Sequence, residues 1–240
     1  NLNSAILVDS ILNNANLRNA DLENVILNDT SLVSVNLTKT NLSGVDLSGI
    51  DLTNVLLKES DNSHANLSGQ DLSGRDLSGI NLSVKDLSFS ILTNVDLSGR
   101  NLTGANLTGA FLFGTTLAGA DLSYTSLPYA YLSSKDLTGT NLSGADLSYA
   151  NLDGVDLSGK DLTGTILMAA NLANVNLSGV DLSDMDLSYA ILTNVDLSGR
   201  DLTGTNFDIA KLGGVNLENT TLTKASFVQV DFTKIKNKSL

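Results

Sequence analysis

A leucine recurs at every fifth position of this chain, and this spacing constrains the fold more than any other feature. Counting from Leu2 in steps of five gives 48 positions, of which 43 are Leu and three are Phe. The two exceptions are Asn62 and Asn237. Because no insertion shifts the phase, one repeat extends through the chain, and we predict a single domain, 1–240.

Each position of the five-residue unit has its own chemistry. The residue before the central Leu is Asp or Asn at 32 of 48 positions, the residue after it is mostly Ser or Thr, and the next is Gly 19 times and Asn eight times. A period of five fits neither a helix nor an extended strand, so the chain must bend once per unit. Gly or Asn suits the third residue of a type II turn, which takes a positive φ.

Four such turns close a square of 20 residues, with the central residue and the residue two before it inside. The sequence supports this period independently, because SFSILTNVDLSGR at 88–100 recurs as SYAILTNVDLSGR at 188–200. We therefore predict an all-β solenoid, a parallel β-helix of about 12 coils of 20 residues. At about 4.8 Å per coil, the rod is roughly 58 Å long.

The unit (Asp/Asn)-Leu-(Ser/Thr)-Gly-(Ala/Val) resembles the repeat of the pentapeptide-repeat family over essentially the whole chain. The resemblance implies a right-handed quadrilateral β-helix and says little about function. Some members resemble a DNA duplex in width and charge and inhibit or protect DNA gyrase, which gives DNA mimicry as an alternative function. The near-uniform Leu and the lack of a helical C-terminal dimer module depart from those members.

Composition predicts a non-enzymatic protein. The chain has no Cys and a single His, His64, so we expect no catalytic, metal or cofactor site. Stacked Asp residues present a flat ladder rather than converging calcium ligands, and we expect them to cap turns. A net charge of −12 argues against direct binding of nucleic acid. No apolar run is long enough to span a membrane, and the compartment stays open.

Seven polar residues occupy the inward position two before the central Leu, where an apolar side chain is expected: Gln70, Arg75, Lys85, Arg100, Lys135, Lys160 and Arg200. Burying an unpaired cation costs several kcal/mol. We expect the charged heads to bend around the corner of the coil toward water and acidic neighbours, as a structural adjustment. The functional alternative is a set of basic corners that guide a partner.

Outward aromatic and aliphatic residues gather on one side when the sequence is wrapped at 20 residues per coil. We call this surface the aromatic face; its candidate residues are Phe89, Ile91, Phe111, Phe113, Tyr129, Tyr131, Tyr149 and Tyr189. An exposed apolar patch usually marks an interface. We predict that it binds a protein partner or a second copy, the alternative being a solvated stripe. Ice or mineral binding by Ser/Thr columns is a third class, disfavoured because Lys58, Pro128 and Met168 interrupt the columns.

Two segments depart from the repeat. The segment KESDNSH at 58–64 contains Asn62 and predicts an irregular loop, either a surface bulge or a recognition loop. The basic segment at 226–240 predicts an atypical closing coil. Because an open β-helix end exposes unpaired backbone groups, we expect end-to-end packing or continuation into a longer protein.

Overall fold

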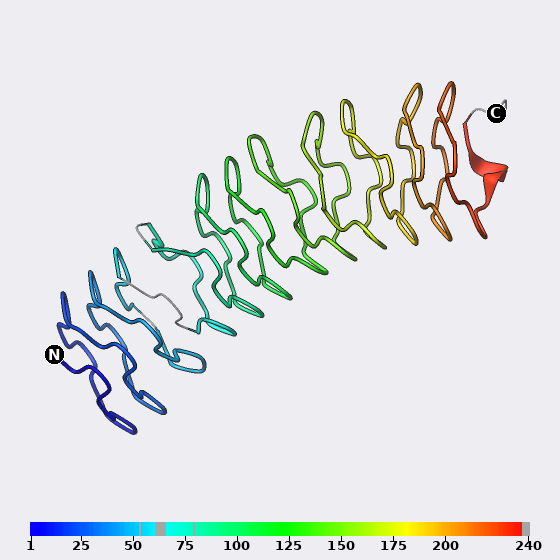
Figure 1. Ribbon diagram of the computed structural model, residues 1–240. Coiled ribbons are helices and arrows are strands. Elements are labelled where there is room, and N and C mark those ends of the chain that lie inside the picture. Colours follow the sequence, from blue (N-terminus) through cyan, green and yellow to red (C-terminus); the bar gives the residue numbers. More distant parts are fainter. Residues whose placement is uncertain (53, 61–65, 79, 237–240) are drawn as a thin grey trace.

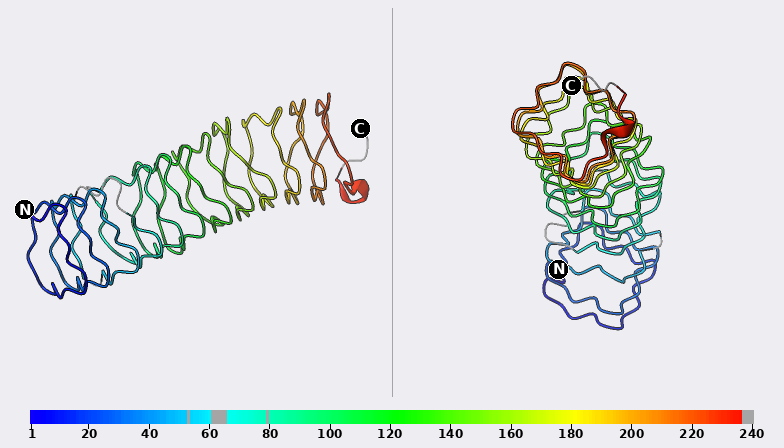
Figure 2. Two further views of the ribbon diagram at one scale, coloured as in Figure 1. Left: turned by 60° about the horizontal axis from the view of Figure 1, so that its bottom comes forward. Right: turned by 90° about the vertical axis from the view of Figure 1, so that its right-hand side faces the viewer.

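The chain forms an elongated rod of stacked coils. The computed structural model describes residues 1–52, 54–60, 66–78 and 80–236, and its two termini lie at opposite ends of the rod (Figure 1). When one end of the rod is turned toward the viewer, the chain is seen to wind through successive coils of similar outline (Figure 2). Parallel bridges join residues 20 apart, such as Ile91 with Phe111 and Asn151 with Asn171. The prediction of a right-handed quadrilateral parallel β-helix with about 12 coils of 20 residues is confirmed.

Successive coils are joined by main-chain hydrogen bonds on their flat sides. Between the coils that begin at residues 81 and 101, Leu87 N donates to Asn106 O at 2.8 Å, and Asn106 N donates to Lys85 O at 2.8 Å. These bonds involve isolated bridges rather than long strands. The helical element of the described chain is η1, a 3₁₀ turn at Phe232–Lys234, capped by the Asp231 carboxylate, which accepts from Thr233 N. No helix among the described residues is long and apolar enough to cross a membrane.

A tight turn forms each corner of a coil. Its first and fourth residues are hydrogen bonded, as where Ala150 N donates to Leu147 O at 3.0 Å. The third residue has a positive φ at every described position of the repeat from Ser4 to Gln229. This confirms the predicted turn. The position is not restricted to Gly and Asn, because Val84 and Tyr129 adopt φ values of 51° and 62° there.

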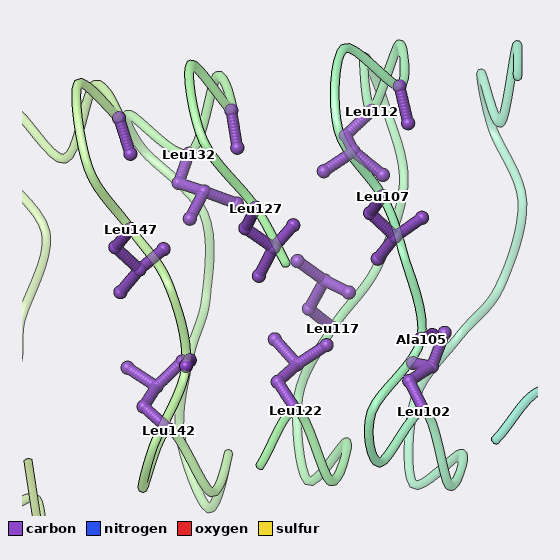
Figure 3. Packing of buried hydrophobic residues seen from close by; sticks show 14 of the residues in the cluster. Leu102, Ala105, Leu107, Leu112, Leu117, Leu122, Leu127, Leu132, Leu142 and Leu147 are labelled. Carbon is purple, nitrogen blue, oxygen red and sulfur yellow. The ribbon is translucent and has the colours of Figure 1, made fainter. Parts of the chain in front are cut away.

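The interior is filled by the central Leu and by the residue two before it. Figure 3 shows central residues such as Leu102, Leu107 and Leu122 pointing into the space between the walls, where they are buried. Beneath the aromatic face the residues two before the central Leu include a column of Ala, among them Ala130 and Ala150, and these are buried.

The two ends of the rod differ in how far they are covered. Leu2 and Leu7, in the first coil, are only partly buried. At the other end, the Phe227 ring stacks on Phe207 at 5.0 Å and meets Phe232 of η1 at 5.3 Å. Of the predicted closing coil at 226–240, residues 226–236 are described.

The predicted irregular loop at 58–64 is described only in part. Residues 58–60 keep the regular turn, with Ser60 N donating to Leu57 O, and the Lys39 ammonium lies 3.2 Å from the Glu59 carboxylate. Asn62 and His64 lie outside the described residues.

The inward cations bind main-chain carbonyls of the preceding coil, which differs from the expected approach to acidic neighbours. The Lys160 ammonium donates to Leu137 O at 2.6 Å and to Thr140 O at 3.1 Å. Arg75, Arg100, Lys135 and Arg200 likewise reach carbonyls 20 or 23 residues earlier. Gln70 reaches Leu47 O, and Lys85 is buried. Burial lowers the pKa of Lys135 and Lys160, and Asp156 and Asp136 partly oppose the shift of the Lys160 pKa.

These cations occupy main-chain carbonyls that a regular coil offers to a main-chain amide. In the regular ladder, the carbonyl 20 residues before an inward residue accepts from the amide that follows this residue, as Thr125 O accepts from Asp146 N. At the five cations with described carbonyl partners, the side chain takes that carbonyl and the amide bond is absent from the described chain. The bond is also absent at some positions with an uncharged inward residue, as at Asp186 and Asp196. Inward Thr residues are shorter and keep it: Thr165 Oγ1 donates to Leu142 O, and Ile166 N still donates to Ala145 O.

Replacing Lys160 by Thr should close the ladder at this corner. A Thr hydroxyl can bind Leu137 O, and the Asp161 amide is then free to donate to Thr140 O. We expect amide hydrogen exchange of Asp161 to slow about fivefold, as one added hydrogen bond of about 1 kcal/mol requires. Lys160→Met is the matched control, because it keeps a long side chain and should leave the exchange fast. Equal exchange in both variants would contradict the assignment that Lys160 keeps the Asp161 amide from bonding to Thr140 O.

Candidate protein-interaction face

The aromatic face occupies one flat side of the rod and its two flanking corners. Phe111 and Tyr131 lie on the flat side, Tyr129 and Tyr149 on one corner, and Phe113 on the other. All eight predicted residues are exposed, with Phe113 the most exposed at 81%. The structure therefore brings them together on one surface. Whether this surface binds a partner stays a prediction.

One corner of the face carries aromatic residues in a left-handed backbone conformation. Phe89, Tyr129, Tyr149 and Tyr189 have φ values between 58° and 62°. For residues other than Gly this conformation costs roughly 1–2 kcal/mol each. Bulky residues in such a conformation are uncommon, and strained positions cluster at functional sites. The side chains, rather than the turn, must account for these residues.

The aromatic rings of this corner lean along the rod axis. Tyr129 and Tyr149 stack with ring centroids 4.8 Å apart and 14° between their planes, which is the spacing of one coil. The Phe89 ring lies over the next coil at Gly109, where an added Cβ would come within 2.7 Å of ring carbon Cδ1. The Phe89 ring therefore fits over Gly109 because glycine has no side chain, and any larger residue at position 109 would displace the ring.

A hollow of about 680 Å³ opens across the aromatic face. Its lining includes Gly109, Phe111 and Phe113 from one coil and Tyr129 and Tyr131 from the next. The described chain has no main-chain hydrogen bond between residues 108–118 and 127–137, although bonds join the same two coils on either side, as from Leu107 N to Ser126 O at 2.8 Å. The two coils separate here, and aromatic rings line the gap.

Lys135 lies at one edge of this gap. Its ammonium donates to Leu112 O at 2.6 Å and to Thr115 O at 2.8 Å, the first and last residues of the turn that presents Phe113. Thr115 Oγ1 ties the same turn to the coil on its other side by donating to Leu92 O at 2.8 Å. The most exposed aromatic residue of the face is thus held on a turn that is fixed from both sides.

The other flat sides are acidic. Asp161, Asp181 and Asp201 form a column on the side opposite the aromatic face, and each carboxylate accepts from the backbone N–H of the Ser or Thr two residues later at 2.9 Å. These bonds, with those from the hydroxyls of the same residues, hold the pKa of each carboxyl below its usual value. Among the described residues, no three His, Cys, Asp or Glu side chains are grouped as a metal site would require.

The sequence analysis missed one exposed aromatic residue outside the face and two features of the face itself. Tyr124 is as exposed as Tyr131 but lies at a corner away from the face. The gap between coils and the overlap of Phe89 with Gly109 were also not foreseen. A signal for the overlap exists, because a large residue at a turn is followed 20 residues later by Gly in several places, as Tyr124 is by Gly144.

Comparison with known proteins agrees with this architecture. A family profile described as pentapeptide repeats matches the chain in eight stretches, at residues 1–32, 15–54, 63–99, 86–119, 116–159, 145–184, 165–204 and 201–236. No curated protein matches the sequence.

Three solved structures illustrate the similarity. HetL, a pentapeptide repeat protein involved in heterocyst differentiation regulation in the cyanobacterium Nostoc sp. strain PCC 7120, is 30% identical over 94% of this chain and 88% of its own, with a TM-score of 0.36. Rfr23, from the cyanobacterium Cyanothece 51142, is 25% identical over 61% of this chain and 91% of its own, with a TM-score of 0.27. QnrB1, a plasmid-mediated fluoroquinolone resistance protein, is 20% identical over 95% and 90%, with a TM-score of 0.28.

The acidic column predicts loss of stability in acid. Because the folded pKa values lie below 3.8, the folded state holds fewer protons than the unfolded state in that range. This stabilisation is present above about pH 4 and disappears as the pH falls through the folded pKa values. Replacing Asp161, Asp181 and Asp201 by Asn keeps the oxygen that accepts the turn N–H. The variant should lose less stability than the native protein in thermal unfolding between pH 7 and pH 2; equal losses would contradict the assignment.

Proposed function

This chain belongs to the pentapeptide-repeat family, and we propose that it is a non-enzymatic rod that binds protein through its aromatic face. The observation that carries the proposal is a set of exposed aromatic residues along one side of a rod whose net charge is −12. In coils 81–140 the flat side and both corners of this face carry no carboxylate. Interface cores are depleted in charged residues and enriched in Tyr, Phe and Met.

The shape of the face supports a partner with side-chain anchors. The hollow beside Gly109 and Phe111 is large enough to take apolar side chains, and aromatic anchors in such hollows dominate the binding energy of many interfaces. The two coils beneath the hollow share no main-chain hydrogen bond across it, but bonds join them on either side, and Lys135 ties the turn of Phe113 to the next coil. These contacts hold the surface in place before a partner arrives. A prearranged surface loses little conformational entropy on binding.

A second candidate function rests on the acidic flat sides. The carboxylates of Asp161, Asp181 and Asp201 are spaced along the rod, and hydrogen bonds from the turns hold their pKa values below the usual value, so they are ionised at neutral pH. This observation favours occupation of a DNA-binding surface, and DNA gyrase is the target that the family resemblance suggests. The distribution of Asp over all four sides weighs against DNA mimicry, because it marks no single side as a DNA-like surface. The aromatic face is the one side that differs from the others.

Site-specific photo-cross-linking tests the proposed face in the cells that naturally produce the protein. Replacing Tyr131 by p-benzoyl-L-phenylalanine should give a covalent protein adduct on irradiation, because the new side chain lies in the centre of the face. Tyr124 provides a matched control: it is 71% exposed, against 70% for Tyr131, but points from another corner. Adducts from position 124 alone, or from neither position, would contradict the proposal.

A gyrase supercoiling assay tests the second candidate. If the aromatic face is the functional surface, a titration of the purified protein with and without a quinolone should leave supercoiling unchanged. Inhibition or drug protection that is lost in the Asn variant of Asp161, Asp181 and Asp201 would transfer the function to the acidic side. The variant with Phe111, Tyr129 and Tyr131 changed to Ser is the control with an unaltered charge.

A further inference from the structure

The two ends of the aromatic face match each other at equal distances from its midpoint. Six residues, each 20 apart, form its middle column: Ile91, Phe111, Tyr131, Asn151, Asn171 and Ile191. The midpoint lies between Tyr131 and Asn151, and Ile occupies both ends. The flanking sequences at the two ends also match, as SFSILTN at 88–94 and SYAILTN at 188–194.

Side-chain size is symmetric about the same midpoint at the corner that carries Phe89 and Tyr129. The column runs through Phe89, Gly109, Tyr129, Tyr149, Ala169 and Tyr189, so the order is large, small, large, large, small, large. Read from either end the pattern is the same. All six residues have a positive φ, so the turn geometry does not require this order.

The charges beyond the two ends of the middle column are opposite in sign. The middle column is uncharged from Ile91 to Ile191. One coil beyond the first end it continues with Asp71, and one coil beyond the other end with Lys211, and both side chains are exposed. One corner of the face is therefore symmetric in size, and the charges beyond the two ends of the middle column are opposite at equal distances from the midpoint.

We propose that the partner of the aromatic face is a second copy of this chain, packed face to face and antiparallel about a twofold axis between Tyr131 and Asn151. This inference rests on the proposed function and names the partner of the same surface. A twofold axis makes each contact occur twice, so a self-complementary patch is required. Opposite charges at equal distances from the midpoint are a property that such a patch needs.

The antiparallel arrangement matches the face residue by residue. It brings Ile91 against Ile191 of the second copy, Tyr131 against Asn151, and Asp71 against Lys211. On the other corner Phe113 faces Ala173, so the most exposed aromatic side chain meets a small one. A parallel arrangement in register would instead bring Asp71 against Asp71 and Lys211 against Lys211, and like charges across an interface are unfavourable.

Electrostatics also explain why two copies would meet through the aromatic face and not through another side of the rod. Two copies of net charge −12 repel each other, and the flat side opposite the aromatic face carries Asp121, Asp161, Asp181 and Asp201. The uncharged stretch of the middle column covers six coils, about 29 Å of the rod, and Asp153 lies at the flanking corner that carries Phe113. A contact of this length is short for a stable complex, so we expect weak, salt-sensitive association at micromolar concentrations or above.

Charge exchange tests the direction of packing. At low salt, Asp71→Lys and Lys211→Asp should each weaken dimerisation by about tenfold in sedimentation equilibrium, since two attractive pairs become repulsive. The double variant should restore the native affinity. Asp121→Lys is the matched control on the opposite side: its carboxylate, like that of Asp71, accepts from the Ser two residues later, so the turn is disturbed equally.

Cysteine pairing tests the register, because the native chain has no Cys that would interfere. The variants Ile91→Cys and Ile191→Cys should form a disulfide-linked dimer when they are mixed and oxidised, and neither should do so alone. A disulfide dimer of Ile91→Cys by itself would overturn the antiparallel arrangement.

The outcomes separate this inference from the proposed function. A protein that stays monomeric at every concentration, or that responds equally to Asp71→Lys and Asp121→Lys, would overturn self-association. If Tyr131 still gave a photo-cross-linked adduct of a mass other than twice that of the chain, the face would remain a protein-binding surface with a different partner. The loss of that adduct would instead remove the proposed function itself.

Discussion

The structure depends on one backbone constraint, a turn every five residues whose third residue is left-handed. This turn sends the central residue and the residue two before it inward, and the other three outward. Four turns bring the chain back to its starting side 20 residues later, where backbone groups of successive coils can pair. Because the path is fixed by the backbone and the Leu core, the outward residues can vary without changing the fold.

The left-handed position shows how the outer surface departs from what the fold needs. Gly removes the conformational cost at this position, and Asn tolerates it well. Tyr and Phe do not tolerate this conformation well, yet four of them occupy one corner. Stacking of Tyr129 on Tyr149, and of Phe89 over Gly109, offsets part of the strain. The rest is tolerated by a core whose buried Leu residues contribute about 1.5–3 kcal/mol each.

The fold was predictable from the sequence because the period and the turn chemistry agree with each other at nearly every unit. The clustering of the aromatic residues followed from the same period, since 20 residues per coil places Phe111 above Tyr131. The positions of the inward cations were not predictable. Charge and burial alone favoured carboxylates as partners, whereas the carbonyls at residues 20 and 23 earlier lie nearer, because every turn exposes them to the next coil.

The gap in the aromatic face links these two features. Lys135 donates to the carbonyl of Thr115, which in a regular coil would accept from the amide of Asp136, and that amide bond is absent from the described chain. The coils separate from this corner across the flat side, and the same ammonium fixes the turn of Phe113. A residue that is anomalous inside the rod therefore shapes the surface outside it. In a fold this regular, a change in the outer surface can be produced by a departure within the core.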